Sequence, residues 1–245
     1  MSSSGASAPV EVVIFDWGGT LTPWHDVDVA QGYRAYALGY DAAHGEEVVA
    51  ALMAAEHRAW TRGRAPAFRS STLTGLVAEA GLDPAGPRHE RGVRALQEFW
   101  EPHTYADPDA LPLIAELRAR GVGVGVLSNT VWSREYHEEV FRRDGLLGLI
   151  NAAVYSCELE VVKPHPGAFA AVLSALGGVP ADRALFVGDR LYEDVHGAQQ
   201  AGMRAVLVPH SRPPTTQLVD IEVRPDGVAN RLLDLLDLLD RLANP

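Results

Sequence analysis

Short apolar runs rich in Val, Leu and Phe end in polar residues at three points along this 245-residue chain. The runs and the residues that follow them are 10–15 before Asp16, 122–127 before Ser128 and Asn129, and 184–187 before Asp189. Buried parallel strands have this continuous apolar character, and open α/β sheets collect functional residues at the carboxyl ends of such strands. The pattern therefore predicts a parallel sheet with a polar site along one edge.

Helix-like segments alternate with strand-like runs through the second half of the chain. The expected helices are 108–120, 134–143, 167–176 and 195–201, and the further expected strands are 152–156 and 204–208. Because strands joined through helices run parallel with right-handed crossovers, we expect an α/β fold, a Rossmann-like and mainly parallel sheet with helices on both faces. Residues 211–225 are expected to form a loop. A leucine stripe over 232–242 predicts a helix packed on this sheet, or alternatively a dimer contact.

Residues 24–103 have a different character from the rest of the chain. Ala, Arg, Glu and aromatic residues recur there at helical spacing, with breaks at 63–66 and 81–87, and no strand pattern is present. We interpret this part as a helical insert after the first strand. The expected organisation is an N-terminal tail over 1–8, an α/β core over 9–22 and 106–245, and an all-helical domain over 23–105.

Charge and composition restrict the possible partners and the compartment. The formal net charge is −11 with no basic cluster, whereas nucleic acids and anionic membranes require concentrated Lys and Arg. A single cysteine, Cys157, excludes an internal disulfide and fits a reducing compartment. The chain begins without a signal-peptide pattern and contains no run of membrane-spanning length. We therefore expect a cytoplasmic protein that binds neither nucleic acid nor membranes.

Lys163 is the only lysine, because arginine fills every other basic position. It lies in the segment VVKPHPGAF, where Pro164 and Pro166 restrict the backbone on its C-terminal side. A chain that otherwise uses arginine for positive charge can require a compact ammonium group at this position. The alternative is that the position of one lysine carries no functional meaning.

Together these stretches resemble the haloacid dehalogenase-like hydrolases. The resemblance is carried by Asp16 in DWGGT, by Ser128 with Asn129, by Lys163, and by the run GDRLYEDVHGAQQAG over 188–202, in that order. It covers 10–21 and about 113–208, and it implies a phosphatase whose helical insert forms a cap over the core site. One position departs from the family pattern: the first motif usually has a second aspartate where this chain has Gly18.

The resemblance also implies a role for each motif residue. Asp16 would attack phosphorus and form an aspartyl-phosphate, which water later hydrolyses. The phosphoryl group would be bound by Ser128, Asn129, Lys163 and Gly19. A Mg²⁺ ion would be held by Asp16, the main-chain carbonyl of Gly18, Asp189 and Asp194. The alternative for the last two acids is the ordinary preference of acidic residues for a helix N-terminus.

Gly18 removes the group that, in family members with the second aspartate, protonates the leaving oxygen and then activates water. General acid–base catalysis contributes roughly a hundred- to ten-thousand-fold, so its absence matters most for poor leaving groups. A good leaving group, as in an acyl or aryl phosphate, or a proton supplied by the substrate would compensate. A substitute side chain is the third possibility, and the candidates are His25, Asp26, His44 and His57.

We therefore expect a Mg²⁺-dependent phosphomonoester hydrolase that acts on a small phosphorylated metabolite, as a monomer or a homodimer. A 2-haloacid dehalogenase is the alternative enzyme, because Gly18 permits it, although halide displacement needs neither Asp189 nor Asp194. Phosphonate cleavage is disfavoured because the insert lacks a lysine, and phosphoryl transfer between sugar positions is disfavoured because it requires acid–base groups. A catalytically weak pseudophosphatase that acts as a binding protein is the non-enzymatic alternative.

The insert also contains side chains that could contact a substrate. An arginine group could bind a substrate carboxylate or second phosphate, with solvated helix charges as the alternative. Its members are Arg58, Arg62, Arg64 and Arg69. Trp60 and Phe68 could stack on a substrate, but aromatic residues more commonly pack in a core.

Overall fold

The computed structural model describes residues 8–23, 27–64, 66–209, 211 and 218–243, and contains one six-stranded sheet in the order β3-β2-β1-β4-β5-β6. All neighbouring strands are parallel, which confirms the predicted sheet. The strands are β1 Val12–Phe15, β2 Gly123–Ser128, β3 Ala152–Tyr155, β4 Ala184–Gly188, β5 Arg204–Leu207 and β6 Gly227–Val228. β1 lies between β2 and β4, so three neighbouring strands come from distant parts of the sequence.

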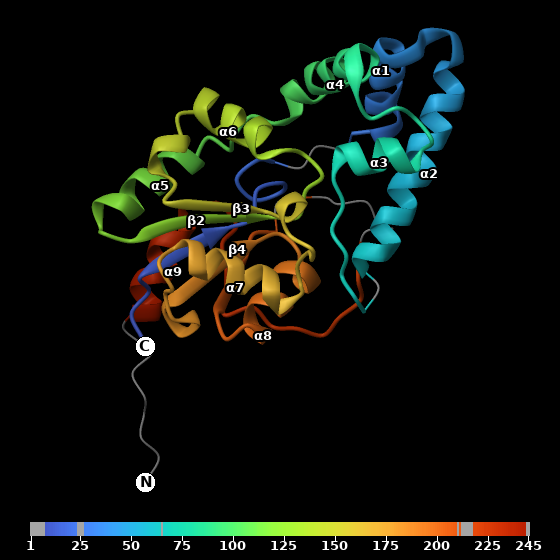
Figure 1. Ribbon diagram of the computed structural model, residues 1–245. Helices are drawn as coiled ribbons and strands as arrows, with labels where there is room; N and C mark the ends of the chain where they lie inside the picture. The colour runs from blue at the N-terminus through green and yellow to red at the C-terminus, as the bar shows by residue number, and fades with distance from the viewer. Residues whose placement is uncertain (1–7, 24–26, 65, 210, 212–217, 244–245) are drawn as a thin grey trace.

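Helices cover both faces of the sheet, as the α/β pattern predicts. α5 and α6 lie on one face, and α7 and α8 lie on the other (Figure 1). The core helices are α5 Ala110–Ala119, α6 Arg134–Arg143, α7 Pro166–Ala175, α8 Gly197–Gln200 and α9 Asp234–Ala243. These helices bury apolar side chains against the sheet, and this burial supplies most of the stability of such a layer.

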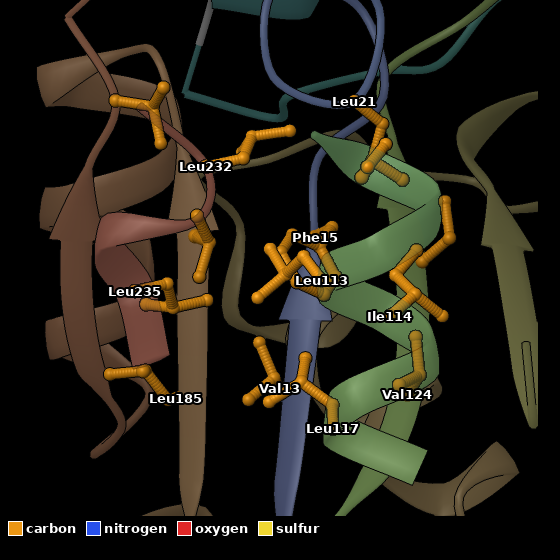
Figure 2. Close-up of a cluster of buried hydrophobic side chains, with 14 of the residues drawn as sticks. Val13, Phe15, Leu21, Leu113, Ile114, Leu117, Val124, Leu185, Leu232 and Leu235 are labelled. Atoms are coloured by element: carbon orange, nitrogen blue, oxygen red, sulfur yellow. The ribbon is translucent and has the colours of Figure 1, made fainter. Parts of the chain in front are cut away.

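The larger core cluster lies between β1, α5 and α9. Figure 2 shows Val13 and Phe15 facing Leu113 and Leu117, with Leu235 on the other side of the cluster. The stripe leucines at positions 232, 235 and 239 are buried in this same cluster. The predicted packing of the C-terminal stripe on its own sheet is therefore confirmed.

Four helices form the cap, and they lie together at the upper right in Figure 1. They are α1 Val29–Asp41, α2 Gly45–Arg64, α3 Leu73–Glu79 and α4 Gly86–Trp100. Their shared core includes Tyr36, Leu52, Val77 and Leu96, separate from the two core clusters at the sheet. This arrangement confirms an α/β fold with a helical cap, and we keep 23–105 as the proposed limits of that cap.

Two elements were not predicted from the sequence pattern. Leu191–His196 forms a π-helical segment, so the α-helix expected over 195–201 is reduced to Gly197–Gln200. β6 has only two residues, one of them glycine, so it is too short to show the alternating sequence pattern of a strand. No helix in the described part of the chain combines the length and apolar character that crossing a membrane requires.

Candidate active site

The ends of β1, β2 and β4 bring the first predicted site residues to one edge of the sheet. Phe15 pairs with Val126 of β2 and with Val187 of β4. Asp16 directly follows β1, Ser128 ends β2, and Asp189 directly follows β4. Because these strands are parallel and in register, their polar ends lie side by side, as the sequence predicted.

Lys163 occupies the centre of this edge. Its Nζ donates to Oδ1 of Asp16 at 2.9 Å and to Oδ1 of Asp194 at 2.6 Å. The lysine side chain is 2% exposed. Burial opposes its positive charge, but the attraction of the two carboxylates is larger and raises the Lys163 pKa. The lone lysine of the sequence is therefore a buried ammonium group between two acids.

Asn129 holds the main chain of Lys163 in place. The Lys163 amide N–H donates to Oδ1 of Asn129 at 2.8 Å, and Nδ2 of Asn129 donates to the Lys163 carbonyl at 3.0 Å. The oxygen and the nitrogen of the Asn129 side-chain amide thus both bind the main chain of Lys163. The structure gives Asn129 a positioning contact on Lys163, while its predicted contact with a phosphoryl group stays a prediction.

Asp16 lies in an environment that disfavours its charge. Burial raises its pKa to about 6, although the attraction of Lys163 lowers it and the repulsion of Asp194 raises it further. A carboxylate that is to attack phosphorus must be ionised. Additional positive charge beside Asp16 would therefore favour the ionised form of its carboxylate.

Asp189 is the least compensated acid of the group. Its side chain is fully buried, and within the described residues neither carboxylate oxygen accepts a hydrogen bond. The Nε of Arg190 lies 3.3 Å from one oxygen as an ion pair. Burial and the repulsion of Asp194 and Asp16 raise the Asp189 pKa well above its ordinary value. Both oxygens of such a carboxylate have lone pairs available to bind another group.

Asp16, Asp189 and Asp194 together form a group that could hold a metal ion. One oxygen from each lies within 4.8 Å of the others. Among the described residues, the cations paired with these three carboxylates are Lys163 and Arg190, which leaves one negative charge in excess. Oxygen donors and excess negative charge suit a hard divalent cation such as Mg²⁺. The residues present therefore fit the predicted metal.

The two glycines of the first motif have different surroundings. Gly19 has φ +91°, and a side chain there would overlap the carboxylate of Asp189. Its amide N–H donates to the carbonyl of Thr22 at 2.7 Å, and the phosphate contact predicted for Gly19 stays a prediction. The hydroxyl of Ser211 donates to the Gly19 carbonyl at 2.6 Å, a contact that no sequence pattern indicated.

A cavity of about 340 Å³ opens between this edge and the cap. Asp16, Ser128 and Lys163 line it from the core, and Tyr33, Glu56 and Trp60 line it from the cap. Other groups on its wall are Trp17, Arg64, Arg69, Trp100, Trp132 and Glu193. The cap therefore encloses the space beside the proposed nucleophile.

Two of the four candidates for a substitute acid lie away from this cavity. His44 and His57 are exposed on the cap and are absent from the cavity wall, while His25 and Asp26 lie outside the described residues. The cavity instead contains the cap carboxylate of Glu56.

The arginine group and the two aromatic residues of the insert separate into different environments. Arg58 and Arg62 both bind Glu79 on the cap. Arg64 and Arg69 line the cavity. Arg64 pairs there with Glu193 at 3.4 Å, whereas Arg69 pairs with the exposed Glu160 at 3.7 Å. Trp60 lines the cavity, whereas Phe68 packs against His165.

A buried aromatic stack supports the loop after β1. The His137 ring lies edge-on to Trp17 at 4.5 Å and is stacked on Tyr155 at 4.5 Å. Its Nε2 lies 3.0 Å from Oγ1 of Thr130. Burial, with a smaller effect from Arg134, lowers the His137 pKa to about 3. Sequence periodicity gave no indication of this stack because its members come from three separate segments.

Replacement of His137 is expected to change the acid sensitivity of the fold. The folded state holds the neutral imidazole, so its stabilising contribution is present above pH 6.5 and is lost as the pH falls from 6.5 towards about 3. Relative to His137→Phe, the wild type should therefore lose about 3 to 5 kcal/mol of unfolding free energy over that range. Urea denaturation across this pH range measures it, and a constant difference would contradict the assignment.

A family model for haloacid dehalogenase-like hydrolases matches residues 10–202. This chain belongs to the haloacid dehalogenase-like hydrolases. The match includes β1 with Asp16, the whole cap, β2, Lys163 and the segment with both later aspartates, so the family covers every part of the site described above. The chain is therefore a hydrolase.

Relatives and solved structures agree with this placement. A glyceraldehyde 3-phosphate phosphatase of Methanopyrus kandleri is 28% identical over 168 residues, covering 69% of this chain and 71% of that protein. A phosphoserine phosphatase of Thermus thermophilus is 34% identical over 152 residues, covering 61% of this chain and 58% of that protein. A haloacid dehalogenase-like phosphatase from Thermococcus onnurineus has the same fold, with TM-score 0.65, 21% identity, and coverage of 94% and 98% of the two chains.

A 2-haloacid dehalogenase from Pseudomonas syringae pv. Tomato is equally similar in fold. Its TM-score is 0.66 at 24% identity, with 95% of this chain and 99% of that chain covered. Similarity of fold at this level of identity does not choose between phosphate and halide chemistry. That choice depends on the residues of the site.

Proposed function

We propose that this hydrolase is a Mg²⁺-dependent phosphatase that acts on a small phosphomonoester, with Asp16 as its nucleophile. The observation that carries the proposal is the contact of Lys163 with Asp16 and Asp194, beside the Asp189 carboxylate, which accepts no hydrogen bond among the described residues. Halide displacement needs no divalent cation and gives no reason for three converging acids. The relatives named as phosphatases support the same choice. The enclosed cavity of about 340 Å³ suits a small substrate.

In the first step, a carboxylate oxygen of Asp16 attacks phosphorus opposite the leaving oxygen. The new O–P bond forms as the ester P–O bond breaks, and the leaving oxygen takes its proton from water or from the substrate itself. The ammonium of Lys163, in contact with Asp16, offsets negative charge on the transferred group. The Ser128 hydroxyl at the end of β2 donates to a phosphoryl oxygen. In the second step, water attacks phosphorus, which releases phosphate and restores the Asp16 carboxylate.

A Mg²⁺ ion would be held by Asp16, Asp189, Asp194 and the main-chain carbonyl of Gly18. When bound, it supplies positive charge that reduces the repulsion between a phosphate dianion and the anionic nucleophile. Asp194 is preorganised for this role, because the amide N–H of Arg190 donates to its Oδ2 at 2.9 Å. Asp189 offers the two oxygens that accept no hydrogen bond among the described residues.

Hydrolysis of p-nitrophenyl phosphate and acetyl phosphate tests the proposal. We expect turnover in the presence of Mg²⁺ and its loss when EDTA removes the metal. Failure to hydrolyse any phosphate ester would favour a pseudophosphatase that only binds its ligand. Chloride release from 2-haloacids without Mg²⁺ would instead establish a dehalogenase.

Gly18 predicts that the rate depends steeply on the leaving group. Without a general acid, alkyl phosphates should be hydrolysed far more slowly than aryl or acyl phosphates. The Gly18→Asp variant places a carboxyl group where such an acid acts, so the ratio of alkyl to aryl kcat should rise by at least about tenfold. Kinetics on a series of esters with increasing leaving-group pKa measures this ratio. A shallow wild-type dependence would mean that another group already protonates the leaving oxygen.

A further inference from the structure

Among the described residues, the cap contributes one acid to the cavity, and several aromatic rings line the same cavity. Glu56 lies on α2 and lines the cavity, as do six Trp and Tyr side chains. Tyr33, Trp60 and Trp100 come from the proposed cap, whereas Trp17, Trp132 and Tyr136 come from the core. Tyr33, Trp100 and Trp132 belong to one packed cluster, and Trp132 stacks on Tyr136 at 4.4 Å. The cavity wall is therefore rich in aromatic rings, one of which, Trp60, already has the guanidinium of Arg64 over it at 4.6 Å from the ring centroid.

Among the described residues, Glu56 has no ion-pair partner, unlike Lys163 and the arginines of the cavity. Its hydrogen-bond partner is the Tyr33 hydroxyl, which donates to the carboxylate. Within the described residues no lysine, arginine or histidine forms an ion pair with Glu56. Of the three arginines in the cavity lining, Arg64 pairs with Glu193, Arg69 with Glu160 and Arg190 with Asp189. Lys163 pairs with Asp16 and Asp194. A partly buried carboxylate without a counter-charge is costly unless a cationic ligand arrives.

The position of Glu56 along α2 places it away from the phosphate end. Arg64, in the last turn of α2, reaches Glu193, which adjoins Asp194. Glu56 lies two helical turns earlier, a rise of about 12 Å from Arg64. Trp60 lies one turn from Glu56 on the same helical face. This placement suits recognition of the far end of a substrate better than protonation of the leaving oxygen.

We propose that Glu56 and the aromatic rings of the cavity bind a protonated or quaternary amine on the leaving group of the substrate. This inference rests on the proposed phosphatase activity and names its substrate class, an amine-bearing phosphomonoester. An ammonium group is attracted both to a carboxylate and to the faces of Trp and Tyr rings. The pKa of Glu56 is raised, chiefly by burial, and an arriving ammonium group would restore its ionised form.

Binding of paired ligands tests the proposal without turnover. Titration calorimetry on Asp16→Asn with Mg²⁺ would compare ω-aminoalkyl phosphates of increasing length with n-alkyl phosphates of the same length. We expect the best amine to bind at least about tenfold more tightly than its neutral partner. In Asp16→Asn/Glu56→Gln that ratio should fall to about one. The matched control is Glu47→Gln on the same helix, because Glu47 is exposed and outside the cavity, and it should leave the ratio unchanged.

Two results would overturn the proposal: neutral phosphates binding as tightly as every amine, or an amine preference that survives Glu56→Gln in a folded variant. Thermal melting of each variant establishes that it is folded. Wild-type turnover of p-nitrophenyl phosphate separates this outcome from failure of the phosphatase function. Loss of the amine preference with turnover intact would reject the amine-bearing substrate alone, whereas absence of turnover on every phosphate ester would reject the underlying activity.

Discussion

Asp16→Asn is expected to lower kcat for p-nitrophenyl phosphate by at least about a thousandfold in the presence of Mg²⁺. The amide keeps the size of the side chain but cannot attack phosphorus as a carboxylate does. Lys163 retains its contact with Asp194 at 2.6 Å, so the fold should persist. Steady-state kinetics with circular dichroism of the same sample measures both properties.

The matched control for this variant is Asp182→Asn. Asp182 is exposed and lies outside the cavity, so the same chemical change there should leave kcat within about twofold of wild type, as expected for a surface substitution. A folded Asp16→Asn protein that retains more than a tenth of wild-type activity would reject Asp16 as the nucleophile.

Asp189→Asn is expected to lower catalytic activity and to raise the stability of the metal-free protein. The Asp189 carboxylate accepts no hydrogen bond among the described residues, and burial, followed by the repulsion of Asp194 and Asp16, raises its pKa. Removing this charge should stabilise the metal-free protein by about 1 to 3 kcal/mol. The same change removes a proposed metal ligand, so Mg²⁺-dependent activity should fall by at least about a hundredfold, as for loss of a major electrostatic contribution to catalysis.

Urea denaturation with and without Mg²⁺ separates these two effects. Wild type should gain stability when Mg²⁺ is added, because a ligand that binds only the folded state stabilises it. The Asp189→Asn protein should be more stable than wild type in EDTA and gain less from Mg²⁺. A variant that is destabilised in EDTA yet responds to Mg²⁺ as wild type does would place the metal elsewhere.

The strand-end residues of the site could be predicted because their signal is local. Asp16, Ser128 and Asp189 each follow an apolar run, and parallel pairing then requires their ends to meet at one edge. The position of Lys163 could be assigned only through family resemblance, since its loop is held by the distant amide of Asn129. Local periodicity contains no information about such a contact.

The features missed by the sequence depend on packing between separate elements. His137 is a polar residue on α6 whose burial arises only when Trp17 and Tyr155 close around it. Glu56 looks like any charged residue of an amphipathic helix until α1 brings Tyr33 against it. The π-helical segment at 191–196 places Asp194 inward where an ordinary helix start was expected. Tertiary contacts override local preference in all three cases.

The central claim is that Asp16 forms a covalent bond to phosphorus. The most direct measurement is rapid acid quenching of wild-type protein during turnover of p-nitrophenyl phosphate with Mg²⁺, followed by mass spectrometry of its peptides. We predict one added phosphoryl group on the peptide containing Asp16, located at that residue and absent without Mg²⁺. A phosphoryl group on any other residue, or turnover without a modified Asp16 under conditions in which release of p-nitrophenol shows a burst, would contradict this account.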